Sequence, residues 1–196
     1  IHKNRVYGYK FFDYWGYTRT VDEYWKTNMD LLGDEPVINL ESWRIRTNLD
    51  HKSTRERQPT IIGPEAEIRN SLIYNGSNIN GKVENSILFP GVQIARGSEV
   101  RNSILMFDTK VGEEVLLDKV ITDGGVCIDS SCQVGMGGYS HPNENHPDLL
   151  TSGITLVGRD THLPSGVTIG KNCIIYPRVS REHFQTKNIP SGKTIL

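Results

Sequence analysis

A short phrase repeated along the middle of the chain constrains the fold more than any other feature. Each copy places a short polar residue and one further residue before two aliphatic side chains, and the copies recur after 15, 17 and 16 residues. One such period holds only very short strands, which cannot bury an apolar face alone. Stacked periods can bury a continuous interior, so the repeat predicts a mainly-β, parallel β-helix. The copies are Asn70-Ser71-Leu72-Ile73, Asn85-Ser86-Ile87-Leu88, Asn102-Ser103-Ile104-Leu105 and Asp118-Lys119-Val120-Ile121.

The residues between the aliphatic pairs are those of tight corners. Asn or Asp before an aliphatic pair suits a corner, because the short side chain bonds neighbouring backbone groups and tolerates unusual dihedrals. Residues 135–147 break the pattern with glycine, proline and asparagine, and the pattern resumes at residues 154–157. A loop that leaves a corner is how solenoids accept insertions. We therefore expect a coil over residues 61–196 with a loop insertion at 136–152, and one more partial turn near residues 190–195.

Composition excludes several classes of partner. The chain of 196 residues has 22 Lys and Arg against 23 Asp and Glu, a formal charge of −1, so charge alone favours neither a nucleic acid nor a membrane as partner. No apolar run approaches the roughly 20 residues of a membrane span, and no signal-peptide pattern is present. These features predict a cytoplasmic protein. Cys127, Cys132 and Cys173 fall where the repeat needs small interior or corner residues, so we expect packing roles and neither a disulfide nor a metal site.

Two elements are expected before the coil. Residues 6–12 are rich in aromatic side chains and predict a strand, and because a lone strand is marginal we expect the sequence to begin inside a larger protein. A helix should begin after Thr20, where the Thr20 hydroxyl and the Glu23 carboxylate form a capping box by satisfying free backbone donors, and Gly33 should end it. One apolar stripe runs along this helix and comprises Val21, Tyr24, Trp25, Met29 and Leu32.

The N-terminal phrase resembles a known family. Residues 13–32, from Asp13-Tyr14-Trp15-Gly16 to Leu31-Leu32, are similar to the end of the catalytic domain in glucose-1-phosphate adenylyltransferases, also called ADP-glucose pyrophosphorylases. Residues 39–40, 43–47 and 58–59 resemble the linker of that family, and the match continues to residues 152–159 and 163–166. The resemblance implies a left-handed, single-stranded coil. It also implies that residues 1–33 end an α/β nucleotidyltransferase domain and that residues 34–60 are a linker.

The resemblance implies a function for the complete protein. Family members join ATP and glucose 1-phosphate into ADP-glucose and pyrophosphate for glycogen or starch synthesis. Their nucleotide loop and catalytic aspartate, which use ATP and Mg²⁺, lie in an N-terminal domain outside this sequence, so we expect no catalytic residue and no cofactor here. The expected role is assembly and regulation. Its expected partners are its own catalytic domain, further copies in a tetramer or a hetero-oligomer, and a phosphorylated metabolite as effector.

Four basic residues are candidates for effector binding. Arg159 matches a position that binds effector in family members, and Lys119, Lys171 and Arg178 are further candidates. The guanidinium fork of arginine suits phosphate if several cations converge. Each could instead be a solvated charge on an outward position of the coil.

One departure from the family leaves the activity of the complete protein open. Tyr17-Thr18-Arg19 stands where the family has Asp-Val-Gly. In related nucleotidyltransferases that aspartate helps to hold Mg²⁺, and a phenol cannot replace a carboxylate for this ion. Either the parent is a variant or a non-catalytic regulatory subunit, or the local alignment shifts and Asp13 or Asp22 compensates.

Other classes of protein use a similar coil. Hexapeptide-repeat acyltransferases often use a histidine as general base, and His141, His146 and His162 are candidates. That interpretation leaves the N-terminal helix and linker without a role. Another sugar-nucleotide pyrophosphorylase would also carry the coil, but the phrase at residues 15–32 favours the glucose family.

Overall fold

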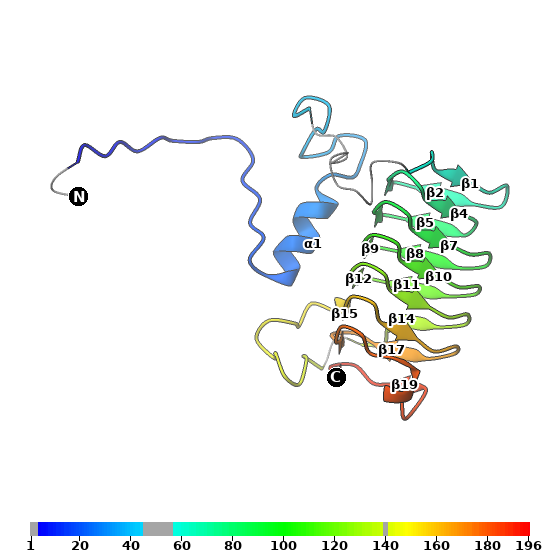
Figure 1. Cartoon of the computed structure of the whole chain (residues 1–196). Helices are drawn as coiled ribbons and strands as arrows, with labels where there is room; N and C mark the ends of the chain where they lie inside the picture. The colour runs from blue at the N-terminus through cyan, green and yellow to red at the C-terminus, as the bar shows by residue number, and fades with distance from the viewer. Residues whose placement is uncertain (1–3, 45–56, 139–140) are drawn as a thin grey trace.

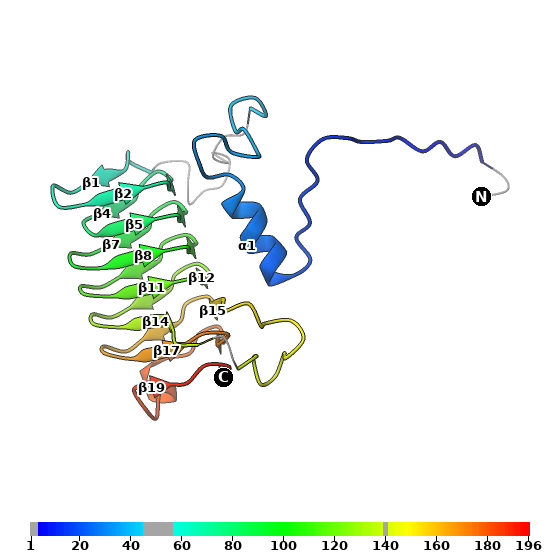
Figure 2. The same cartoon turned by 180° about the vertical axis from the view of Figure 1, so that it is seen from behind.

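The chain folds into a coil whose short strands stack in three parallel sheets (Figures 1 and 2). The structure is a computed structural model that describes residues 4–44, 57–138 and 141–196. The first sheet contains β1 (Ile61–Ile62), β4 (Asn78–Ile79), β7 (Gln93–Ile94), β10 (Lys110–Val111), β13 (Cys127–Ile128) and β16 (His162–Leu163). The second contains β2 (Glu67–Arg69), β5 (Lys82–Glu84), β8 (Glu99–Arg101), β11 (Leu116–Asp118), β14 (Gln133–Met136), β17 (Thr168–Gly170) and β19 (Asn188–Ile189). The third contains β3 (Leu72–Ile73), β6 (Ile87–Leu88), β9 (Ile104–Leu105), β12 (Val120–Thr122), β15 (Thr155–Val157), β18 (Ile174–Ile175) and β20 (Thr194–Ile195).

Columns of aliphatic side chains fill the inside of the coil. In the first sheet the inward column is in strict register and almost fully buried. Burial of each such side chain stabilises the fold by about 1.5–3 kcal/mol, a gain that one coil could not obtain without its neighbours. The predicted parallel β-helix is therefore confirmed, while its left-handed sense stays a prediction. The members of this column are Ile79, Ile94, Val111, Ile128 and Leu163.

The strand register corrects the fourth copy of the repeat. Ile104 pairs with Ile121, so the corner position of Asn102 is taken in the next coil by Lys119, and the predicted start at Asp118 is wrong by one residue. Asn102 and Lys119 both have a positive φ, of 51° and 58°. The chemical likeness of Asp to Asn misled the alignment, because the register is set by which aliphatic side chains must face inward.

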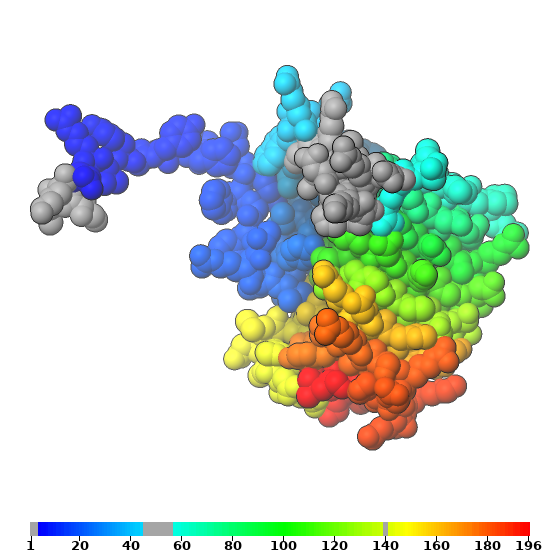
Figure 3. Space-filling view, viewed as in Figure 1, coloured from blue at the N-terminus to red at the C-terminus, as the bar shows by residue number. Residues whose placement is uncertain are grey.

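The outer face of the third sheet is apolar, and α1 (Val21–Met29) packs on it (Figures 1 and 3). Ile104 and Ile121 are buried beneath the helix, and Trp25 Nε1 donates a hydrogen bond to the Asn102 carbonyl at 2.7 Å. The predicted stripe is confirmed for Val21, Tyr24, Trp25 and Met29, all of which pack against this cluster.

Both ends of α1 follow from local sequence. The Glu23 amide donates to the Thr20 hydroxyl at 3.2 Å, which confirms the Thr20 half of the predicted capping box. The Glu23 carboxylate accepts from the Thr20 hydroxyl at 3.1 Å, where the prediction had a backbone donor. The helix ends at Met29, earlier than the predicted stop, and Gly33 follows with φ of 107°. Leu32 therefore lies in a turn after the helix, where its amide donates to the Met29 carbonyl at 2.9 Å.

The predicted strand at residues 6–12 is wrong, because no strand forms in residues 4–20. This segment is extended and runs away from the coil in both views (Figures 1 and 2). A strand needs a neighbour to satisfy its backbone donors and acceptors, and the described residues place none beside this segment. Tyr9 and Phe12 are accordingly 90% and 89% exposed.

A loop between β14 and β15 interrupts the coil and stands out from it in yellow in Figure 1. It covers the segment where an insertion was predicted, although Met136 still belongs to β14. After the loop the coil continues through η1 (Arg181–His183) to β20, so the predicted final turn is confirmed. Residues 45–56 of the predicted linker lie outside the described residues. Near its end, Arg57 Nη1 is 2.6 Å from Asp108 Oδ1.

Among the described residues, no helix combines the length and the apolar content that crossing a bilayer requires.

Candidate functional site

The four basic candidates lie at two corners of the coil, one on each side of the third sheet. Arg159 and Arg178 follow β15 and β18, and the Arg178 amide donates to the Arg159 carbonyl at 2.8 Å, so they occupy consecutive coils at one corner. Lys119 and Lys171 lie at the opposite corner, before β12 and β18. The structure therefore brings the two arginines together and separates them from the two lysines by the width of the third sheet.

A hollow of about 370 Å³ lies on the outer face of the third sheet beside the arginine corner. Its floor is aliphatic and includes Ile121, Leu156 and Ile174. Its rim includes Asp123 and Tyr176. Since α1 packs on the same row of aliphatic side chains, the hollow continues the surface that the helix covers. An apolar floor with a few polar groups at the rim is typical of a small-molecule site.

Arg159 does not line the hollow itself but pairs with Asp123, which does. Its Nη2 is 3.2 Å from Asp123 Oδ1, and its side chain is 65% exposed. Such an exposed ion pair contributes only about 0–1 kcal/mol, so a phosphate could replace Asp123 at modest cost. Asp123 also acts on α1, because burial raises the pKa of the Tyr24 phenol and the negative charge of Asp123 raises it further. The Tyr24 phenol is therefore uncharged at physiological pH.

The lysines have contacts of a structural kind. Lys119 Nζ lies 5.1 Å from the centroid of the Trp25 ring and donates to the Ser152 carbonyl at 2.8 Å. It thus joins α1 to the insertion loop. The backbone amide of Lys171 donates to Ser191 Oγ at 3.1 Å. Neither contact places a lysine beside Arg159.

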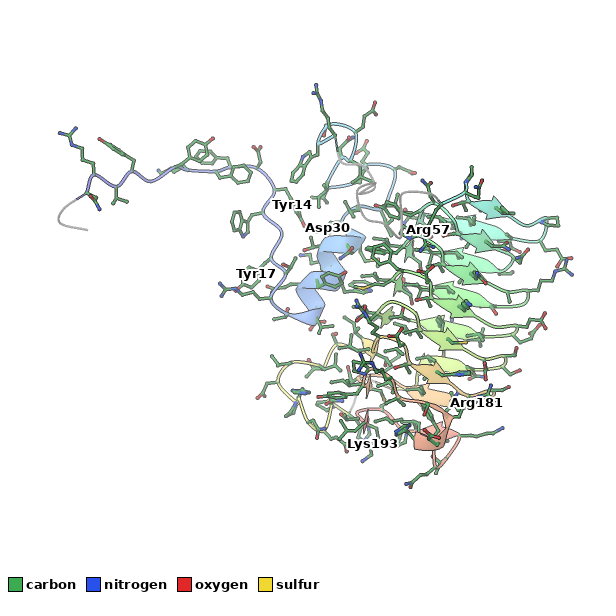
Figure 4. All side chains as sticks on the ribbon, in the orientation of Figure 1. Tyr14, Tyr17, Asp30, Arg57, Arg181 and Lys193 are labelled. Carbon is green, nitrogen blue, oxygen red and sulfur yellow. The ribbon has the colours of Figure 1, made fainter. Side chains whose placement is uncertain are left out.

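The histidine candidates do not form one site. His141 and His146 belong to the insertion loop, whereas His162 lies in β16, where its Nε2 is 2.9 Å from Asp129 Oδ1. Arg181, labelled at the edge of the coil in Figure 4, pairs with the other oxygen of Asp129 at 2.6 Å. Burial alone would raise the pKa of Asp129, but His162 and Arg181 together hold it below its usual value.

Sequence reasoning missed a member of this cluster, Cys127. Cys132 and Cys173 are fully buried, so their predicted packing role is confirmed. The prediction was wrong for Cys127, which occupies the outward position of β13 directly opposite His162. Whether a residue points in or out depends on strand register, which the sequence did not settle at this coil. Burial, followed by the charge of Asp129, raises the pKa of the Cys127 thiol.

Residues 17–19 offer no carboxylate at the position where the resembled family has an aspartate. The Arg19 guanidinium lies 5.4 Å from the centroid of the Tyr17 ring. The small hollow that Tyr17 lines also contains Glu23 and Asp30, but neither Asp13 nor Asp22. Tyr14 donates to Asp30 at 2.9 Å at the C-terminal end of α1, and both residues are labelled in Figure 4. A phenol and a guanidinium do not fit Mg²⁺, which prefers oxygen anions.

Stacked short strands in three parallel sheets define a hexapeptide-repeat β-helix domain. The chain belongs to the GlmU-like, C-terminal hexapeptide family, whose model matches residues 60–157. Its sequence relatives are glucose-1-phosphate adenylyltransferases, which confirms the resemblance found in residues 13–32.

The alignments with these relatives cover almost the whole chain. The glucose-1-phosphate adenylyltransferase of Acetivibrio thermocellus is 38% identical over 97% of this chain and 44% of the relative. That of Thermomicrobium roseum is 41% identical over 100% of this chain and 45% of the relative. The chain thus spans less than half the length of these relatives and corresponds to their C-terminal part. Among solved structures, the acetyltransferase domain of PglB from Neisseria gonorrhoeae has a TM-score of 0.43 and 15% identity, over 71% of this chain and 50% of that chain.

Proposed function

We propose that this chain is the assembly and regulatory part of a cytoplasmic glucose-1-phosphate adenylyltransferase. The observation that carries the proposal is 38–41% identity to such enzymes over the coil and the segment before it together. In the proposed reaction a phosphate oxygen of glucose 1-phosphate attacks the α-phosphorus of ATP. The bond to the β-phosphate oxygen breaks, and pyrophosphate leaves while Mg²⁺ and basic groups neutralise its charge. These steps belong to a nucleotide-binding domain outside this sequence, so the 196-residue chain alone should be inactive.

The surface of the N-terminal segment supports a contact with that domain. Tyr7, Tyr9, Phe12 and Trp15 are each more than three-quarters exposed, a concentration of aromatic surface that usually marks an interaction site. The segment leads directly into α1, which Trp25 and Lys119 fix to the third sheet. A movement of the catalytic domain would therefore reach the coil through this helix. The coil itself would supply the contacts between subunits in a tetramer or a hetero-oligomer.

The arginine corner is the proposed binding place for a phosphorylated effector. Arg159 and Arg178 lie in consecutive coils beside the apolar hollow, and guanidinium groups bind phosphate through paired hydrogen bonds. Titration of the 196-residue chain with inorganic phosphate, followed by the NMR shifts of residues around Arg159, tests this. We expect weak, saturable phosphate binding that the Arg159→Ala substitution reduces. The control, Lys110→Ala, removes a positive charge on the first sheet and should leave phosphate binding unchanged. Equal phosphate binding by the Arg159→Ala variant and the natural chain would count against the site.

Catalysis is tested separately by pyrophosphate release from ATP and glucose 1-phosphate. We expect release by the full-length protein and none by the 196-residue chain. A non-catalytic regulatory subunit is the second candidate, favoured by Tyr17 and Arg19, which cannot hold Mg²⁺. A silent full-length protein that Tyr17→Asp does not rescue would support this second candidate and exclude the first.

A further inference from the structure

Three side chains with different metal-binding chemistry meet on the outer face of the first sheet. The Cys127 sulfur, a carboxylate oxygen of Asp129 and a ring nitrogen of His162 all lie within 4.8 Å of one another. Within the described residues, this is the one such group of histidine, cysteine and acidic side chains.

The coil itself brings these residues together. β13 and β16 pair in parallel with Cys127 directly opposite His162, and neighbouring strands are about 4.8 Å apart. Cys127 and Asp129 face the same side because successive residues of an extended chain alternate in direction. The inward residue between them is Ile128, which is buried in the core. Since the insertion loop lies between the two strands in sequence, the cluster joins the coil before the loop to the coil after it.

We propose that Cys127, Asp129 and His162 form a binding site for a divalent transition metal, with Zn²⁺ as the ion that fits best. Thiolate, imidazole and carboxylate together are ligands that Zn²⁺ takes, whereas Mg²⁺ and Ca²⁺ prefer oxygen alone. Bonds of about 2.0–2.3 Å place ligand atoms roughly 3–4 Å apart around a tetrahedral ion, so small rotamer changes complete the site. The side chains of His162 and Asp129 are 36% and 23% exposed, which leaves the fourth position open to water.

Two nearby cationic side chains disfavour the binding of a divalent ion by electrostatic repulsion. Lys110 is the register neighbour of Cys127, and Arg181 Nη2 is 2.6 Å from Asp129 Oδ2. The arginine pairs with one oxygen of Asp129, while the other, Oδ1, is directed at His162. Its side chain is 65% exposed, so it can move away when a metal binds. A metal site therefore predicts that removal of Arg181 strengthens metal binding, although the same change removes an ion pair from the folded protein.

Metal binding would act as a clip between coils. An ion that binds the folded chain and not the unfolded chain stabilises it by mass action. Zn²⁺ should accordingly raise the melting temperature of the metal-free protein and protect β13 and β16 from hydrogen exchange. Binding would release the thiol proton of Cys127 to solvent, because the thiolate is the ligand.

The test is a titration of the reduced, chelator-treated 196-residue chain with Co²⁺, followed by displacement with Zn²⁺. We expect thiolate-to-Co²⁺ charge-transfer absorption that Zn²⁺ abolishes. Cys127→Ser should remove this absorption, and His162→Ala should weaken Zn²⁺ binding about tenfold or more. Arg181→Ala should strengthen it. His183→Ala changes an exposed histidine of η1 and is the matched control, with no expected effect.

Each arm can overturn the proposal without reference to enzyme activity. Absence of the thiolate absorption in the natural chain excludes a site that contains Cys127, whatever the variants do. Equal Zn²⁺ affinity of the natural chain and the His162→Ala variant, with both folded by circular dichroism, also excludes it. Weaker Zn²⁺ binding by the Arg181→Ala variant would show that the arginine supports binding rather than competes with it, and would contradict the geometry proposed here.

Discussion

One residue per coil carries the turn between the second and third sheets. Asn70, Asn85 and Asn102 have φ of 45°, 45° and 51°. This left-handed region costs most residues roughly 1–2 kcal/mol, and asparagine tolerates it better than other side chains. Asn102 Nδ2 also donates to Asp118 Oδ1 at 2.9 Å, across to the next coil. The corner residue therefore sets the turn and links neighbouring coils at once. The asparagines could be predicted as corners from their chemistry alone, but Lys119 could not, because a lysine carries no sign of a left-handed backbone.

The first prediction concerns Asn102, where substitution by alanine should destabilise the protein more than substitution by glycine. In an ordinary strand or helix the order is the reverse. Asn102→Ala imposes left-handed strain and loses a hydrogen bond, so we expect it to lower the free energy of unfolding by about 1–3 kcal/mol. Asn102→Gly loses the same bond without the strain and should be milder. Urea denaturation measures both. At Asn78, in the extended strand β4, the order should reverse. A milder effect of alanine than of glycine at Asn102 would contradict the role given to the positive φ.

At the scale of elements, the packing of α1 on the third sheet has some features that can be predicted from the sequence and others that cannot. The cap at Thr20 and the apolar stripe are local patterns and could be predicted. The docking face could not be predicted from the helix, because it depends on the outward column of the third sheet. Paired aliphatic residues such as Ile104-Leu105 indicate that the outer face of the sheet is covered, because one side chain faces the core and the other faces α1. Such a pair needs cover on both sides of the strand.

The second prediction follows from the position of Trp25 at the centre of this contact. Trp25→Ala removes its bond to the Asn102 carbonyl, its contact with Lys119 and its buried ring area. We expect faster amide exchange throughout α1 and a loss of local stability of about 3 kcal/mol, with exchange in β4 and β7 unchanged. Lys26→Ala, on the exposed side of the helix, is the control and should leave the α1 rates as they are. Unchanged protection of α1 in the Trp25→Ala variant would mean that other contacts hold the helix.

At the scale of the whole molecule, each coil contacts chiefly its neighbours, so stability is local along the stack. The repeat made this architecture predictable. The insertion loop made two features unpredictable, because it separates residues that the register then reunites. One is the cluster of Cys127, Asp129 and His162, and the other is the attachment of the loop itself. Asn143 and Leu150 are buried within the loop, and Glu144 Oε2 pairs with Lys193 Nζ at 2.7 Å. Glycine and proline content indicates a loop but not what anchors it.

The last prediction is that Asn143 closes the C-terminal end of the coil. Its side-chain amide donates to the Asn172 carbonyl at 3.0 Å, and its oxygen accepts from the His146 amide at 3.1 Å. Asn143→Ala leaves the buried Asn172 carbonyl and the half-buried His146 amide without these bonds, which should cost about 2 kcal/mol or more. Because the stack is local, hydrogen exchange should accelerate in β15, β18 and β20 and stay unchanged in β4 to β9. Asn145→Ala alters an exposed neighbour in the same loop and should have no such effect. Uniform acceleration along every coil of the Asn143→Ala variant would instead show that the stack unfolds as one cooperative unit.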